Sequence, residues 1–392
     1  MRRAGHRLRL TAKLIRVSED APLWAETFDR TVDDVFAVQD EVTTRIVETI
    51  TTALQLGRLR GQVPASPTRS LEAYDLYLLG RHHWYQRSNA GMRRARELFQ
   101  EAIAIDPAYA PAQSGLADAT ALLASWQFAA PEEMFPSAVA AARRALELDP
   151  SLSEAHASIG FVKYAWEWDW VGAVQSLRRA IALNPNNETA HRWLSGFLGG
   201  IGRYEEAMPI AERAVALDPL SMLPRMNVGI IQWLNGRGED AVRSFQAIVD
   251  REPHFARAVN FLAATHTSLG RHDRAIPLLE ELLARDPKDV AARWALGVTY
   301  AGGGRTDDAR RMFADTGANF PGLYVAIGHG LLHEEDAMFA ALEEAIRTRG
   351  DWTYTLAQQP WFRPWHGDPR FTRLVALLGL PDASAPIASG QD

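Results

Sequence analysis

One dipeptide, an acidic residue or asparagine followed by proline, recurs through the middle of the 392-residue chain at a nearly constant interval. Its prolines are Pro107, Pro150, Pro185, Pro219, Pro253 and Pro287, at successive intervals of 43, 35, 34, 34 and 34 residues. Proline cannot continue a helix, and it disfavours helical geometry in the residue before it. We therefore expect a helix to end at each dipeptide and a repeating unit to begin after it.

A second signal divides each unit into two helices. Glycine readily takes the left-handed conformation that ends a helix. It recurs between the prolines at Gly202, Gly236, Gly270 and the run Gly302–Gly304. Alanines follow with the same interval, at Ala173, Ala207, Ala241, Ala275 and Ala309. The pattern predicts a helix, a turn and a second helix in each unit.

The interval and the residue pattern resemble the tetratricopeptide repeat (TPR), a helix–turn–helix unit. The residues that keep the register of that family include Leu296, Gly297, Tyr300, Ala309 and Phe313. Gln232 and His266 depart from it, because the family prefers tyrosine there. The resemblance implies an all-α fold, a right-handed superhelix of helix pairs that touch most closely at the alanines. It also implies a concave groove, lined by the first helix of each repeat, that receives an extended peptide or a partner helix.

Two of the units depart from the regular interval. The interval from Pro107 to Pro150 is nine residues longer than the usual 34, and we place the extra residues around 125–131. The next unit carries Trp166, Trp168 and Trp170 at its inter-helix turn. An exposed tryptophan there could anchor a partner, whereas packing in the core or between repeats is the alternative reading of these residues.

The N-terminal region follows a different pattern. Alternating apolar residues between Leu8 and Leu14 predict a half-buried strand, and residues 23–28 predict a second one, so the pair forms a hairpin. A helix should begin near Asp33-Asp34. Residues 9–15, 23–30 and 34–42 resemble the second half of a TolB-like α/β domain of bacterial regulatory proteins. Because the first half is missing, we expect the natural chain to be longer.

The sequence therefore predicts five regions. They are the C-terminal half of a TolB-like domain at 1–56, a polar linker at 57–70, about six to seven TPRs at 71–319, terminal repeat-like helices with an aromatic cap at 320–380, and a disordered tail at 381–392. A solenoid needs a cap because its last repeat would otherwise expose an apolar face.

Composition limits the possible functions. The net charge of −6 argues against a general nucleic-acid binder, and the absence of cysteine excludes disulfides and thiolate chemistry. Because no apolar run is long enough to span a bilayer, we expect no membrane span from this sequence. We expect a cytoplasmic location, with the extracytoplasmic part of a longer membrane-anchored protein as the alternative.

The sequence shows no convincing catalytic, cofactor or metal site. His333 lacks the second histidine of a zinc-protease helix, and His82 and His83 diverge on their helix. The glycines at 199–202 and 302–304 follow no strand, so a phosphate loop is not expected. Counting back from the prolines instead places a candidate partner-binding set on the concave face: Arg192, Met226, Trp233, Asn260, Thr267 and Trp294. Asn227 and Asn260 lack the lysines of a carboxylate clamp.

These observations favour a non-catalytic scaffold or sensor module that binds a protein or peptide. The resemblance adds an alternative, in which the chain is the regulatory part of a class III adenylate cyclase, a Ser/Thr kinase or a winged-helix transcriptional regulator whose effector domain lies outside this sequence. A third possibility is self-association through the N-terminal hairpin, because an uncovered strand edge invites pairing.

Overall fold

The computed structural model describes residues 2–4, 7–16, 21–31, 41, 42, 45, 68–126, 128–315 and 322–381. The chain forms two compact units. Unit 1 comprises residues 1–119 with 147–149, and unit 2 comprises residues 120–146 with 150–392.

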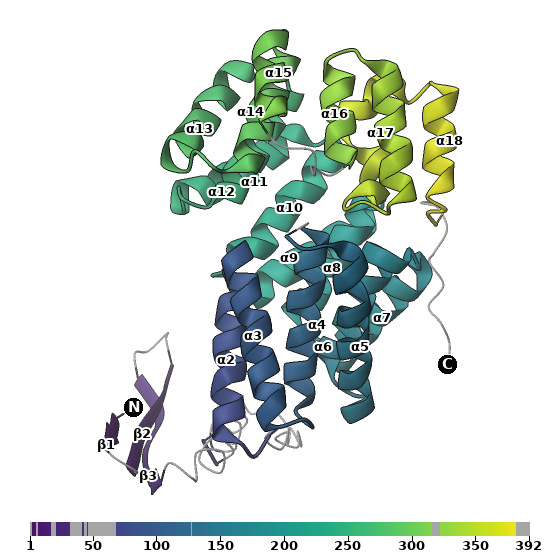
Figure 1. The fold of residues 1–392 in the computed structure, drawn as a ribbon. Coiled ribbons are helices and arrows are strands. Elements are labelled where there is room, and N and C mark those ends of the chain that lie inside the picture. Colours follow the sequence, from purple (N-terminus) through teal and green to yellow (C-terminus); the bar gives the residue numbers. More distant parts are fainter. Residues whose placement is uncertain are drawn as a thin grey trace. The chain divides into compact units, whose positions relative to one another are not determined.

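The described part of the chain is built mainly from helices (Figure 1). The helices up to the first regular repeat are α2 (Leu71–Tyr85), α3 (Asn89–Ile105), α4 (Ala110–Ser125), α5 (Pro131–Leu148), α6 (Ser153–Val162), the π-helix η2 (Lys163–Glu167) and α7 (Trp170–Leu183). Then follow α8 (Glu188–Gly200), α9 (Tyr204–Leu217), α10 (Met222–Leu234), α11 (Gly238–Arg251), α12 (Ala256–Ser268), α13 (His272–Arg285), α14 (Val290–Gly302) and α15 (Thr306–Ala314). The last elements are α16 (Gly322–Leu331), α17 (Glu335–Arg347), the 3-10 helices η3 (Thr353–Gln358) and η4 (Pro360–Trp365), and α18 (Pro369–Leu377).

Unit 1 contains a three-stranded antiparallel sheet in the order β1 (Arg2–Ala4), β2 (Arg7–Arg16) and β3 (Ala21–Thr31). The predicted hairpin is confirmed as β2 and β3, whose register pairs Leu10 with Phe28. The short strand β1 was not predicted. The helix expected after Asp33-Asp34 and the linker at 57–67 lie outside the described residues, as does the tail from Asp382.

In unit 2, α6 to α17 form successive helix pairs, and the two members of each pair contact each other. This arrangement confirms the predicted helical solenoid. In several repeats, the residue before the proline fixes the turn after the second helix. The side chain of Asn184 accepts a hydrogen bond from the amide of Asn186 at 3.0 Å, and Asp286 accepts one from Lys288 at the same distance. The dipeptide therefore both stops a helix and closes the next turn.

The turn inside each repeat needs one residue in the left-handed conformation. Gly202, Gly236, Gly270 and Gly304 take φ values between +74° and +86° there. In the repeat with the tryptophan-rich turn, the position 34 residues before Gly202 is Trp168, which adopts φ +59°. His333 has the same φ between α16 and α17. Side chains rarely adopt this conformation, so both positions need compensating contacts.

The five periodic alanines lie where the paired helices meet. Ala173, Ala207, Ala241, Ala275 and Ala309 are all fully buried. Close approach is also enforced on the first helix of a pair, because a Cβ added at Gly229 would lie 2.7 Å from the ring of Phe245. The same holds for Gly297 and Phe313, at 2.6 Å. The sequence pattern thus marks the closest helix contacts.

Candidate functional site

The first helices of the repeats in unit 2 are α6, α8, α10, α12, α14 and α16. Consecutive members of this series contact one another, so they form a continuous surface. We call it the first-helix face. The candidate partner-binding residues all lie on these helices.

The structure places the six predicted residues in two groups. Met226 and Trp233 are only 5% exposed, and Thr267 is equally buried and shares a 2.9 Å hydrogen bond with Thr299. Arg192, Asn260 and Trp294 are half-buried and keep some contact with solvent. Their role in binding a partner remains a prediction, and the second group is the one with accessible atoms.

Much of the first-helix face is covered by the chain's own C-terminal segment, residues 351–378, which we call the strap. After α17 the chain turns back and continues as η3, η4 and α18. The strap contacts α16 and α17, as expected of a cap for the last repeat. It also contacts α8, more than 150 residues earlier in the sequence. The strap therefore does more than cover the end of the solenoid.

Aromatic side chains hold the strap against several repeats. The ring of Tyr354 lies 5.7 Å from the rings of both Tyr164 and Phe197. Trp361 contacts Trp233 with ring centroids 5.9 Å apart. Aromatic pairs at such distances contribute beyond the area that they bury. The buried Trp233 thus packs against the strap as well as against Phe261 and Ser268 of α12.

The tryptophan-rich turn holds the chain at the C-terminal end of the strap and, through Arg349, two residues before its start. Arg349 donates hydrogen bonds to the carbonyl oxygens of Trp166 and Glu167, at 2.9 and 3.0 Å. The indole Nε1 of Trp170 donates to the carbonyl oxygen of Leu378 at 2.9 Å. For Trp170, which is 6% exposed, the packing interpretation is therefore the right one.

A cluster of charged and polar residues lies among these elements. We call it the polar cluster, and it comprises Ser125, Arg192, Arg257, Asn260 and Asp351. The charges of Arg192 and Asp351 both act on Arg257, and Asn260 follows Arg257 by three residues on α12. Ser125, the last residue of α4, donates a hydrogen bond to Asp351 of the strap at 3.1 Å. Trp126 follows Ser125 in the sequence, and its ring centroid lies 4.4 Å from the guanidinium of Arg257. The inserted segment and the strap thus meet at the cluster.

Burial shapes the ionisation of this cluster. Burial raises the pKa of Asp351 to about 7, although its hydrogen bond from Ser125 and the charge of Arg257 both lower it. Burial also lowers the pKa of the Arg257 guanidinium, and the charge of Arg192 acts in the same direction. Both effects show that the medium around these groups solvates charge poorly.

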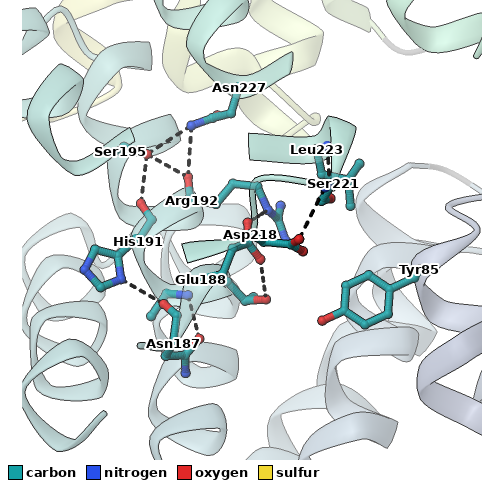
Figure 2. Close-up of polar contacts among 12 residues, drawn as sticks. Tyr85, Asn187, Glu188, His191, Arg192, Ser195, Asp218, Ser221, Leu223 and Asn227 are labelled. Atoms are coloured by element: carbon teal, nitrogen blue, oxygen red, sulfur yellow. Dashed lines mark hydrogen bonds and ion pairs between the residues drawn. The ribbon is translucent and has the colours of Figure 1, made fainter. Parts of the chain in front are cut away.

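Arg192 is held at one end and unsatisfied at the other. Its Nε donates to Glu188 at 2.8 Å, and its carbonyl oxygen accepts a hydrogen bond from Asn227 at 3.4 Å (Figure 2). Its buried Nη2 atom has no hydrogen-bond partner. The buried Oδ1 of Asn260 also lacks one. The cluster therefore holds one unused donor and one unused acceptor.

Sequence reasoning found Arg192 and Asn260 but missed Ser125, Arg257 and Asp351. A charged residue on a helix or in a loop is usually solvated, so its type alone gave no signal. The inserted segment around 125–131 was itself a signal, because residues outside the repeat pattern are free to serve another purpose.

The other residues considered for chemistry have structural roles or form no site. His333 occupies the left-handed turn before α17, and His329 contacts Glu334 at 2.6 Å. The glycines at 199–202 and 302–304 end helices. Within the described residues, no group of three metal-binding side chains could hold an ion, and no helix is long and apolar enough to cross a membrane.

The comparisons agree with the fold. Models described as tetratricopeptide repeat match residues 169–221, 229–281 and 267–326, so this stretch contains TPRs. Human IFIT1, solved as a dimer with PPP-AAAA, shares the fold with a TM-score of 0.53 and 16% identity, over 89% of this chain and 82% of that one. The TPR protein YrrB, described as having an unusual peptide-binding site, is 23% identical over 50% of this chain and 95% of its own, with a TM-score of 0.33.

One curated relative carries the name of an enzyme. A putative adenylate cyclase 3 of Rhizobium meliloti is 33% identical over 163 residues, which is 40% of this chain and 27% of that protein. The chain spans roughly a third or less of the length of each curated relative that it matches. TPR proteins generally mediate protein–protein interactions, and the repeats of this chain belong to that class of module.

Proposed function

We propose that this chain is a non-catalytic interaction module that binds a segment of a protein partner on its first-helix face. The observation that carries the proposal is the arrangement of TPRs with half-buried polar and aromatic groups, Arg192, Asn260 and Trp294, on that face. Apolar surface with a few polar groups suits a peptide or helix ligand. Where the strap covers the face, a partner must displace it.

We further propose that the module regulates a bacterial signalling protein in the cytoplasm. The relative named a putative adenylate cyclase supports a cyclase as the effector over a kinase or a transcriptional regulator. The TolB-like resemblance of the N-terminal strands fits the same proposal. Assays of the 392-residue chain for cyclase activity, kinase activity and DNA binding should all be negative, and clear activity in any of them would refute a purely regulatory role.

Binding is tested with a display library of short peptides, followed by fluorescence anisotropy on the selected sequences. We expect Trp294→Ala to weaken binding by about tenfold, because an aromatic anchor commonly supplies 1–2 kcal/mol or more. Leu220→Ala is the matched control, since Leu220 is 74% exposed and lies in a turn after a second helix. If no peptide is selected, or if both variants bind as the unchanged chain does, the first-helix face is not the binding surface.

A further inference from the structure

The polar cluster contains a cation that the protein leaves unpaired. Arg257 forms no hydrogen bond or ion pair with any residue that the structure describes, and its guanidinium lies against the ring of Trp126. Elsewhere in unit 2, arginines such as Arg203 and Arg305 pair with carboxylates at 2.6 Å. Burial destabilises the Arg257 cation. The carboxylate of Asp351 acts on it electrostatically but forms no ion pair with it, so the group lowers the stability of the fold.

A second guanidinium lies near the first. The charge of Arg192 acts on Arg257, so the two groups repel each other. Glu188 satisfies only part of the Arg192 guanidinium. Its carboxylate contacts Nε of Arg192, whereas Nη2 of Arg192 has no hydrogen-bond partner. Two guanidiniums that face poorly solvating surroundings with free N–H groups are the usual recognition elements for carboxylate and phosphate oxygens.

The surrounding groups favour a small ligand that carries both a hydrogen-bond acceptor and a hydrogen-bond donor. Asn260 lies one helical turn after Arg257 on α12, and its buried Oδ1 can accept a hydrogen bond from a ligand hydroxyl or amine. The half-buried Tyr324 and Tyr354 are close enough to act electrostatically on the cluster. Asp351, supplied by the strap, borders the site and is held by Ser125.

We propose that the polar cluster is a binding site for a small anion that carries a carboxylate or phosphate group, held between Arg257 and Arg192. The anion would pair with the free cation and relieve the repulsion between the guanidiniums. The site would take its floor from α8 and α12 and one border from the strap. This proposal does not depend on the proposed function, although an anion and a peptide would both use Arg192 and Asn260.

The test uses the full 392-residue chain with inorganic phosphate and with citrate, each compared with sodium chloride at equal ionic strength. Isothermal titration calorimetry should show saturable binding of at least one of the two anions, and thermal unfolding should shift upward with its concentration. The anion that binds more tightly distinguishes a phosphate ligand from a carboxylate ligand. Absence of saturable binding by both anions would overturn the proposal.

Variants identify the site. Arg257→Gln should weaken binding at least tenfold while leaving the unliganded chain as stable as before or more stable, because it removes an unpaired cation. Arg274→Gln is the matched control, since that side chain is exposed on α13 and should leave binding unchanged. If Arg257→Gln binds like the control, or only destabilises the unliganded chain, Arg257 has a packing role and the proposal is wrong.

A second substitution covers the case in which Arg257→Gln does not fold. Asn260→Asp preserves the shape of the side chain but adds a negative charge beside the bound anion. We expect at least a fivefold loss of affinity at pH 8. An unchanged affinity would place the anion elsewhere and overturn the assignment.

Discussion

At the scale of single residues, the left-handed position of each repeat shows how one side chain can replace glycine. A non-glycine residue in this conformation costs about 1–2 kcal/mol. Contacts of the Trp168 ring offset that cost, since the ring lies 5.4 Å from the ring of Trp170 and 5.7 Å from the guanidinium of Arg349. The strained position therefore also contacts Arg349, two residues before the strap.

The buried alanines give a direct prediction about packing. Ala241→Leu should lower the free energy of unfolding by about 1–3 kcal/mol, because three more carbon atoms must fit where two helices touch. Ala247→Leu is the control on the same helix, at an exposed position. Denaturant unfolding of both variants compares them, and equal stabilities would show that the α10–α11 contact is not close-packed at Ala241.

Asp351 gives a prediction about pH. Its pKa is raised in the folded chain, so the folded state holds this proton more tightly than the unfolded state does. The resulting stabilisation is complete below about pH 4, the usual pKa of an aspartate, and is lost as the pH rises through about 7. Asp351→Asn, which stays neutral, should therefore gain about 1–2 kcal/mol relative to the unchanged chain between pH 5 and pH 8.

Unfolding of both proteins is measured across that range, with Asp273→Asn as the control because Asp273 is exposed on α13. A difference between the chain and Asp351→Asn that is constant with pH would mean that the carboxyl is ionised normally.

The residue scale also shows what a sequence can predict. The alanines and glycines were predictable because their period is a packing requirement. Arg257 and Asp351 were not, because their burial depends on a segment far away in the sequence. The repeat period placed Met226 and Trp233 on the right helices. It did not indicate that the strap covers them, because the strap lies far away in the sequence.

At the scale of elements, the departures from the regular repeat come together. The inserted segment that begins at the end of α4 contacts the strap through Ser125 and Asp351, and the tryptophan-rich turn contacts Arg349 just before the strap. Each departure was visible in the sequence, as extra residues after Pro107, as tryptophans gathered at one turn and as an aromatic segment after the repeats. Their mutual contact was not, because aromatic and proline-rich composition does not specify the surface on which a segment packs.

The anchor at Arg349 can be tested alone. Arg349→Ala removes two hydrogen bonds to backbone carbonyls and the contact with Trp168, and it should lower stability by about 1 kcal/mol because the side chain is exposed. It should also increase proteolysis within the strap. Arg347→Ala, which breaks only a surface pair with Glu344, is the control. Identical protease sensitivity of the two variants would argue against an anchoring role.

At the scale of the whole molecule, the sheet of unit 1 raises the question of self-association. The order β1-β2-β3 leaves β1 and β3 at the edges of that sheet. An unprotected edge can pair with another copy. We predict that light scattering of the chain shows a mass that rises with concentration, and that a shortened chain beginning at Ser70 stays monomeric. A constant monomer mass for the full chain would rule out this mode of association.

The strap lies across the first-helix face and does not only close the last repeat. Hydrogen–deuterium exchange tests this arrangement by comparing the full chain with one that ends at Gly350. We predict that loss of the strap increases exchange in α8 and α10, whose Phe197 and Trp233 contact Tyr354 and Trp361. Faster exchange confined to α16 and α17, with α8 and α10 unchanged, would contradict it.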